Sequence, residues 1–447
     1  MRVSTALAVM TTIAAAGMVQ PATADFDPDA GWVDEERHSL PEWEPGPVPD
    51  PNGFDVYREA CRLYQDPADR GTIQSEWIAA VLGGETKPKP PKPGQPAAEE
   101  PEPVDPGAAL AVMADVVDAC EDVLDRVHAA GQLEYASPVV DDFKDGLPWL
   151  KDFKELARLV VAGALVAYDR GEVSLAFQRL EDGLVLSARV AQDGVLIEHL
   201  VGKAIFDLCR KAQALFLDVG GADADELTAH ARRCREIARD VPAFGTALLL
   251  EARATLTFVD RMQETGARNA LDEVGALKPG VPDPGMNELG AEDIENMRTW
   301  IEDRYARMAE AADEPAVASH IHRLLERTAE DVEARGDPIA PLVFPAMLKI
   351  YDQHLALREA WVVVQLRPAL EAYRVRHGEL PTALEDLTPE IIAELPPEPW
   401  TGDPPLYERV GAEEFMLYSP GFDGVDDGGE TSLLEDGRGP DIVLYPE

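Results

Sequence analysis

Apolar residues recur at helical spacing through most of the chain between about residues 108 and 366. One stripe in ALAVMADVVDACEDVLDRVHAAG consists of Leu110, Met113, Val117, Cys120 and Val123. Such a stripe is typical of a helix that buries one face. The shorter piece FDVYREACRLYQD has the same spacing. The pattern therefore predicts a mainly α-helical protein.

Two stretches divide at turn residues into helix hairpins. DFKELARLVVAGALVAYDRGEVSLAFQRLEDGLVLSARVA divides at Arg170-Gly171-Glu172, and LIEHLVGKAIFDLCRKAQALFLD is joined to DELTAHARRCREIARDV across Gly220-Gly221. Stacked hairpins form an irregular solenoid with a concave face. The residues that resemble a tetratricopeptide repeat are Tyr168, Gly171, Ala176 and Leu180. In such repeats an aromatic precedes a turn glycine and a small residue lets the helices approach, so the resemblance implies a tetratricopeptide-like body.

The pattern changes from about Leu342 onward. We expect a long helix that ends at His377-Gly378, and a proline inside it, Pro368, should kink or break it near Val364. ELPTALEDL follows as a short helix. The strand-like runs are Leu406 to Val410, Phe415 to Ser419 and Ile442 to Tyr445. A helix laid on a small antiparallel sheet makes an α+β unit at the C-terminus.

Proline-rich and glycine-rich stretches divide the chain further. Eight prolines between Pro88 and Pro106 predict an extended linker, and LKPGVPDPGMNELG predicts a long loop before helices restart at Ala291. The expected segments are a signal peptide (1–24), an extended leader (25–52), a short helical segment (53–85), a proline-rich linker (86–107), an α-helical body (108–341) and the α+β unit (342–447).

The N-terminus has the layout of a secretory signal. Arg2 precedes an apolar run from Ala6 to Val19, and Ala22-Thr23-Ala24 offers a cleavage site. The alternative, an uncleaved membrane anchor, needs a longer apolar run, and no other segment has about 18 consecutive apolar residues. We therefore expect a periplasmic or extracellular protein with no membrane span in the mature chain. Its formal net charge of -44 disfavours binding to nucleic acid or anionic lipid.

Four cysteines would lie in a compartment that permits disulfides. The Gly220-Gly221 turn is almost midway between Cys209 and Cys234, so two antiparallel helices would place both at the same height. A Cys209–Cys234 bridge would leave Cys61 to pair with Cys120. The alternative is four reduced, buried thiols.

An acidic loop near the C-terminus is the strongest candidate for ion binding. Seven carboxylates fall in the 21 residues from Gly421 to Asp441, with Arg438 as their only basic neighbour. Like charges at this density repel, so the loop is either solvated or holds a hard cation. Asp423, Asp426, Asp427 and Asp441 could reach one calcium ion, which accepts mixtures of carboxylate and carbonyl oxygens.

The segments LEAYRVRHGELPTALEDL, PEPWTGDPPLYE, FMLYSPGFDG and GPDIV resemble, in order and rough spacing, the G-type major pseudopilins of bacterial type II secretion. The resemblance covers about the last 100 residues. It implies a calcium ion in the loop between the last strands, with Asp423 and Asp441 as side-chain ligands and backbone oxygens near Leu417 and Ser419. The whole layout also looks like a class of secreted bacterial proteins of unknown function with a helical body and a pseudopilin-like tail.

Catalytic patterns are weaker. His320 and His322 are two residues apart on an expected helix and point to different faces, and no G-x-S-x-G, H-E-x-x-H or phosphate-binding glycine loop occurs. Helix packing or capping is the expected role of His354 and His377. We therefore expect a secreted non-catalytic binding or scaffold protein with an unknown protein or peptide partner. The alternatives are an accessory of a type II secretion pseudopilus and an extracytoplasmic hydrolase with a site in the helical groove.

Aromatic residues in the C-terminal unit allow a further alternative. Trp361, Tyr373 and Trp400 could form a recognition surface. We expect them instead to fill the interface between the long helix and the sheet.

Overall fold

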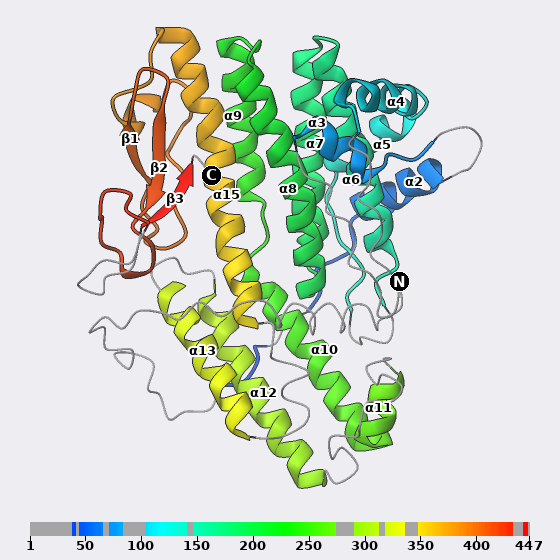
Figure 1. The fold of residues 1–447 in the computed structure, drawn as a ribbon. Helices are drawn as coiled ribbons and strands as arrows, with labels where there is room; N and C mark the ends of the chain where they lie inside the picture. The colour runs from blue at the N-terminus through cyan, green and yellow to red at the C-terminus, as the bar shows by residue number, and fades with distance from the viewer. Residues whose placement is uncertain are drawn as a thin grey trace, which may run out of the picture.

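A chain of helices and one three-stranded sheet make up the computed structural model (Figure 1). It describes residues 38–41, 44–65, 71–83, 104–140, 146–273, 290–312, 318–335, 347–431 and 441–445. The helices are α2 (Gly53–Gln65), α3 (Ser75–Val81), α4 (Pro106–Asp118), α5 (Glu121–Gly131), α6 (Trp149–Asp169), α7 (Val173–Ala191), α8 (Leu196–Val219), α9 (Ala224–Arg239), α10 (Phe244–Thr265), α11 (Ala267–Glu273), α12 (Ala291–Ala311), α13 (Ala318–Arg335) and α15 (Met347–His377). The strands are β1 (Leu406–Arg409), β2 (Phe415–Ser419) and β3 (Ile442–Tyr445). The predicted fold class, mainly helical with a small C-terminal antiparallel sheet, is confirmed.

Several segment predictions fall on residues outside this description. They are the signal peptide, residues 25–37 of the leader, most of the proline-rich linker, residues 277–289 of the long loop and the boundary between residues 341 and 342. The structure does not test these predictions.

Both predicted hairpins form. Gly171, with φ of +76°, turns α6 into α7, and Gly220, with φ of +77°, ends α8 before α9 begins. The ring of Tyr168 at the end of α6 stacks on Phe216 of α8 at 4.1 Å between centroids. Its hydroxyl lies within hydrogen-bond distance of the carbonyls of Phe216 (2.8 Å) and Gly220, which share its one proton. One tyrosine thus ties the ends of the two hairpins together.

The first apolar stripe is divided between two helices. The chain leaves helical geometry at Cys120 (φ −120°, ψ 18°), which caps α5 after α4 has ended at Asp118. Met113, Val117 and Val123 are nevertheless buried on both sides of the break. The stripe therefore predicts burial correctly but does not show the interruption.

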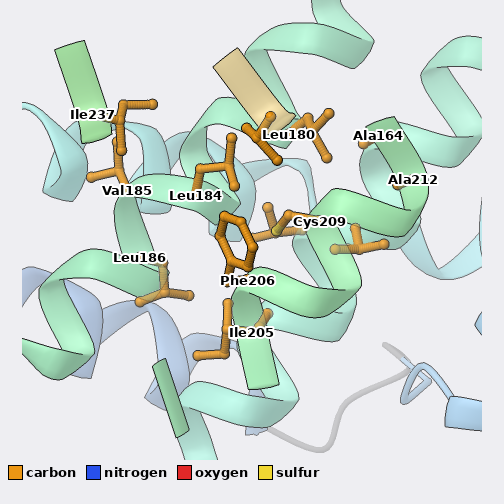
Figure 2. Close-up of a cluster of buried hydrophobic side chains, with 14 of the residues drawn as sticks. Ala164, Leu180, Leu184, Val185, Leu186, Ile205, Phe206, Cys209, Ala212 and Ile237 are labelled. Atoms are coloured by element: carbon orange, nitrogen blue, oxygen red, sulfur yellow. The ribbon is translucent and has the colours of Figure 1, made fainter. Parts of the chain in front are cut away.

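Two apolar cores lie along the molecule. The first joins α2 to α9 with the C-terminal half of α15 and the sheet, and Figure 2 shows its centre, where Leu180 and Leu184 of α7 meet Ile205 and Phe206 of α8. A β-carbon at Gly183 would lie 2.6 Å from the Cys209 sulfur, so a glycine is needed where α7 and α8 approach. The second core joins α10, α12 and α13 with the start of α15.

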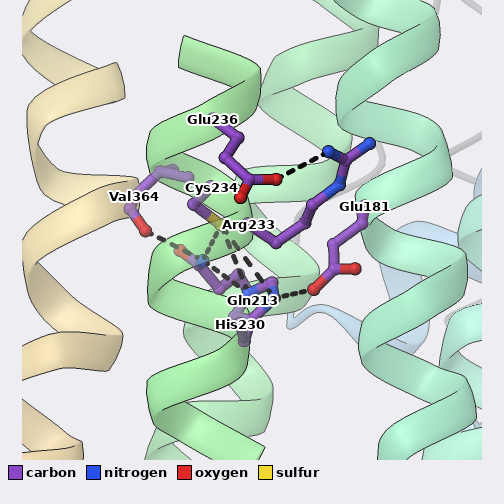
Figure 3. A network of polar contacts seen from close by, with 7 residues as sticks. All are labelled: Glu181, Gln213, His230, Arg233, Cys234, Glu236 and Val364. Atoms are coloured by element: carbon purple, nitrogen blue, oxygen red, sulfur yellow. Dashed lines mark hydrogen bonds and ion pairs between the residues drawn. The ribbon is translucent and has the colours of Figure 1, made fainter. Parts of the chain in front are cut away.

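The long helix α15 runs through Pro368 without a break. Of the predicted kink or break near Val364, the break is therefore wrong and the kink stays a prediction. Proline has no N–H to donate to the carbonyl four residues earlier. The amide of Gln213, on α8, donates to that Val364 carbonyl instead, at 3.1 Å (Figure 3). A side chain from another helix therefore replaces the hydrogen bond that Pro368 cannot make.

The same amide belongs to a buried network (Figure 3). Gln213 Nε2 lies 2.9 Å from His230 Nε2, and His230 Nδ1 lies 2.7 Å from a Glu181 carboxylate oxygen. Because a carboxylate only accepts, His230 donates from Nδ1 and accepts the Gln213 proton at Nε2. The network thus links four helices: Gln213 of α8 contacts α15 and α9, and His230 of α9 contacts α7.

The sheet has the order β1-β2-β3 and is antiparallel throughout. The side chains of Leu417 and Leu444, on the inner face of the sheet, are buried in the first core. Arg367 of α15 lies over the ring of Tyr445 at 4.6 Å from its centroid. The expected short helix after Gly378 is a single 3₁₀ turn, η4 (Leu384–Leu387). The α+β arrangement expected at the C-terminus is present.

All four cysteines are buried in the first core in the thiol form. Burial raises the thiol pKa of Cys209 to about 12, and it also raises that of Cys234. Neither the Cys209–Cys234 nor the Cys61–Cys120 bridge is formed in the structure, and their formation in an oxidising compartment stays a prediction.

A thiol count tests these bridges. For protein from an oxidising compartment, where both predicted bridges would form, we expect no reactive thiol after unfolding without reductant. Two reactive thiols per chain would show that one of the bridges is absent. Four reactive thiols would show that neither forms.

None of the helices within the described ranges combines the length and the apolar character that a membrane crossing requires.

Candidate calcium site

The candidate site follows β2, where the chain turns through the 3₁₀ helix η5 (Gly421–Asp423) and a glycine-rich loop before β3. Gly424 (φ +69°) and Gly428 (φ +73°) take left-handed conformations that residues with a β-carbon rarely adopt. The glycines therefore let the acidic loop fold back on itself beside the sheet.

Asp441, directly before β3, is the most buried of the loop's described acids, with 2% of its surface exposed. Its Oδ2 accepts from the backbone N–H groups of Asp427 (3.0 Å) and Gly429 (2.7 Å). Its Oδ1 is buried and has no hydrogen-bond partner within the described part of the chain. Burial, with the nearby charges of Asp426 and Asp427 adding to it, raises the pKa of the Asp441 carboxyl. This buried oxygen could be satisfied by a cation.

Asp426 and Asp423 both accept hydrogen bonds from groups close to them in the loop. Asp426 Oδ1 accepts from the Tyr418 hydroxyl (3.3 Å) and from Gly428 N (2.9 Å). Asp423 Oδ1 accepts from Val425 N at 2.9 Å. The charges of Asp426 and Asp427 thus lie near enough to act on the Asp441 carboxyl. Asp423 would have to turn toward them to join.

The two backbone candidates lie on β2. The Ser419 hydroxyl donates to Glu398 Oε2 (2.6 Å) and accepts from Gly421 N (3.1 Å), so only its carbonyl remains to be considered as a ligand. Leu417 has its side chain in the first core. The pairing of β2 with β3 shifts register between Leu417 and Tyr418, which disturbs the regular ladder beside the acidic loop.

Side chains alone do not complete a metal site here. In the ranges that the structure covers, no group of three or more His, Cys, Asp or Glu side chains is arranged to hold an ion. Calcium differs from transition metals because it accepts backbone carbonyls and waters together with carboxylates. The donor set is therefore of the kind that calcium uses, with Asp441 as its best-placed member.

Glu398 is a site residue that sequence reasoning did not single out. It is fully buried and accepts from Trp400 N (3.0 Å), from the backbone and hydroxyl of Thr401, and from Ser419. This one carboxylate fastens the PEPWTGD turn to the end of β2. Its only sequence signal was an acid between two prolines.

The same turn contacts the long helix through Trp400, whose indole N–H donates to Glu359 Oε1 at 2.7 Å. Burial, with the Glu398 charge adding to it, raises the pKa of Glu359 to about 7. Phe422, next to Asp423, makes edge contacts with Trp400 (6.2 Å) and with His322 of α13 (5.8 Å). The acidic loop therefore touches the helical part of the molecule as well as the sheet.

The other aromatic and histidine candidates have structural roles. Trp361 of α15 is buried against Phe206 of α8, at 4.6 Å between ring centroids, so it packs between two helices. Tyr373 lies against the His377 ring at 4.2 Å. His322 Nε2 lies 3.2 Å from Asp352 Oδ1 of α15, while the side chain of His320 is outside the described residues.

Comparison of the chain with protein-family models, with curated proteins and with solved structures found no match, so its resemblance to pseudopilins stays a prediction.

Proposed function

We propose that this is a secreted, non-catalytic binding or scaffold protein whose pseudopilin-like C-terminal unit is stabilised by one calcium ion. The observation that carries the proposal is the buried Asp441 Oδ1, which has no hydrogen-bond partner among the described residues. A buried carboxylate oxygen of this kind costs about 1–3 kcal/mol or more when nothing pairs with it. A cation beside it would remove that cost.

Asp426, Asp427 and Asp441 would hold the ion, with Asp423 and the carbonyls near Leu417 and Ser419 as further ligands. Calcium would supply positive charge that offsets the repulsion between these acids. Glu398 and Tyr418 support the site from outside by fixing β2 and Asp426. Because Phe422 contacts Trp400 and α13, ordering of the loop would also fix how the sheet is held against the helices.

The binding role is proposed for the helical body. Its two hairpins, α6–α7 and α8–α9, are of the kind that tetratricopeptide-like proteins use to present a surface to a protein or peptide. The strong negative charge favours a basic partner.

Asp441→Asn tests the calcium site directly. We expect the full-length protein to bind calcium, and to bind terbium in its place, with affinities that Asp441→Asn weakens at least about tenfold, since one charged ligand and its buried oxygen are lost. The measurement is calcium titration by calorimetry, together with terbium luminescence, at about 0.15 M salt to suppress diffuse binding.

Glu413→Gln is the matched control, because it removes the same charge from an exposed side chain of the turn between β1 and β2. It should leave calcium affinity unchanged. Equal affinity in wild type and Asp441→Asn would place any bound calcium elsewhere and refute the proposed site.

A further inference from the structure

Buried polar groups line the plane where the two cores meet. On α8, Leu196 belongs to the second core and Ile205 to the first. On α15, Leu355 belongs to the second core and Leu357 to the first. Four buried titratable side chains on α8, α10 and α15 lie close to these changes of core, and we call them the polar seam: Glu198, His199, Glu251 and His354.

The two histidines of the polar seam contact each other across α8 and α15. His199 Nε2 lies 3.3 Å from His354 Nδ1, and each residue is 2% exposed. Only one proton fits between these two nitrogens, because two N–H groups that face each other repel. The other nitrogen of His199, Nδ1, is buried and has no hydrogen-bond partner within the described ranges. A protonated His199 would carry an N–H there with no acceptor.

Aromatic rings and one like charge are among the described neighbours of the pair. Phe244 of α10 stacks on the His354 ring at 4.4 Å and meets His199 edge-on at 5.2 Å. Tyr351 of α15 also packs beside His354, and the Arg358 charge of the same helix opposes its protonation. Burial lowers the pKa of His199 to about 4 and that of His354 well below its usual range.

The acids of the polar seam face other groups. Glu198 on α8 accepts from Trp149 Nε1 (3.2 Å) and from Val195 N (3.0 Å). Glu251 on α10 accepts from Leu196 N at 3.1 Å, and its charge acts on Tyr305 of α12. Burial raises the pKa of Glu198 to about 8 and that of Glu251 to about 7. Below neutral pH both are therefore protonated and supply no negative charge for an imidazolium.

We propose that the His199–His354 pair is an acid-sensitive joint: its protonation parts the second core, formed by α10, α12 and α13, from the first core. The joint is closed when both rings are neutral and share one proton. Protonation of either ring opens it, because the new charge and its N–H need water. This inference is independent of the calcium site.

Hydrogen exchange on the full-length protein, corrected for the intrinsic effect of pH on amide exchange, tests the joint. As the pH falls from about 6.5 to about 4, we expect amides of α10 and α12 to lose protection at least about tenfold before those of α6 and α7 do. The variant His354→Phe, which keeps an aromatic ring and cannot be protonated, should keep that protection to a lower pH. The exposed His377→Gln on the same helix should behave as wild type.

Two results would overturn the proposal. One is equal loss of protection in both cores of the wild type, and the other is an opening pH that His354→Phe does not move. If His354→Phe fails to fold at neutral pH, His199→Gln provides the same comparison from α8. An opening pH that His199→Gln left unchanged would also refute the joint.

Discussion

Replacement of Gln213 by leucine is expected to lower the free energy of unfolding by about 2–4 kcal/mol. Leucine has a similar volume, so the loss comes from hydrogen bonds and not from a cavity. It would leave the Val364 carbonyl and His230 Nε2 buried without their Gln213 donor, and each such group costs about 1–3 kcal/mol. Urea unfolding followed by circular dichroism measures the change.

A double-mutant cycle with Pro368→Ala tests whether Gln213 replaces the hydrogen bond that Pro368 cannot make. Alanine at this position restores a backbone N–H that can donate to the Val364 carbonyl within α15. In the Pro368→Ala background, Gln213→Leu should therefore cost about 1–2 kcal/mol less than in the wild type. An equal cost in both backgrounds would show that Gln213 does not compensate for the proline. The exposed Gln178→Leu on α7 is the control and should stay within about 0.5 kcal/mol of wild type.

A rise in pH from about 4.5 to about 8 is expected to lower stability through the two acids of the polar seam, and Glu251→Gln and Glu198→Gln should each reduce this loss. The folded chain holds these protons more tightly than the unfolded chain, because the folded pKa values are about 7 and about 8 and the usual value is 4.5. Their stabilisation is therefore complete below pH 4.5 and is lost as the pH rises through the folded pKa values. Between its unfolded and folded pKa values, each acid lowers the free energy of unfolding by about 1.4 kcal/mol per pH unit.

The effect of the two acids on stability is easiest to measure between about pH 6.5 and 8. At lower pH the buried histidines have the opposite effect, since a lowered folded pKa makes stability fall as the pH drops from 6.5 toward 4. Urea unfolding at several pH values should therefore give a smaller slope for Glu198→Gln than for wild type above pH 6.5. The exposed Glu413→Gln should keep the wild-type slope. A wild-type stability that does not change between pH 6.5 and 8 would show that the two acids ionise as freely as in the unfolded chain.

Much of the fold could be predicted from local patterns. The turns at Gly171 and Gly220 need left-handed backbone, so the glycines marked where helices end. The three strands follow from short apolar runs between turn residues. The C-terminal end of the long helix was marked by Gly378, whose φ is +81°.

Features that depend on contacts between distant residues could not be predicted. The helix continues through Pro368 because Gln213 donates to the carbonyl of Val364, 151 positions further along the chain, and no local pattern records that hydrogen bond. The interruption at Cys120 lies inside an unbroken apolar stripe, so periodicity alone does not reveal it either. The polar seam appears only when α8, α10 and α15 meet.

The candidate site divides in the same way. Its acids were evident from the composition of the loop, but density of charge does not separate a solvated loop from an ion site. What favours the ion site is the buried oxygen of Asp441, and burial of this residue depends on the pairing of β3 and on the loop folding back over it. Glu398 was missed because its partners, Thr401 and Ser419, meet only in the folded chain.

Thermal unfolding of the full-length protein in calcium, in magnesium and in chelator shows whether calcium stabilises the folded chain. A ligand that binds only the folded state at about 10–100 times its dissociation constant stabilises it by about 1.4–2.7 kcal/mol. We expect calcium to raise the midpoint above both other conditions, and to raise it clearly less in Asp441→Asn. A wild-type midpoint that is the same in calcium and in chelator would contradict this expectation.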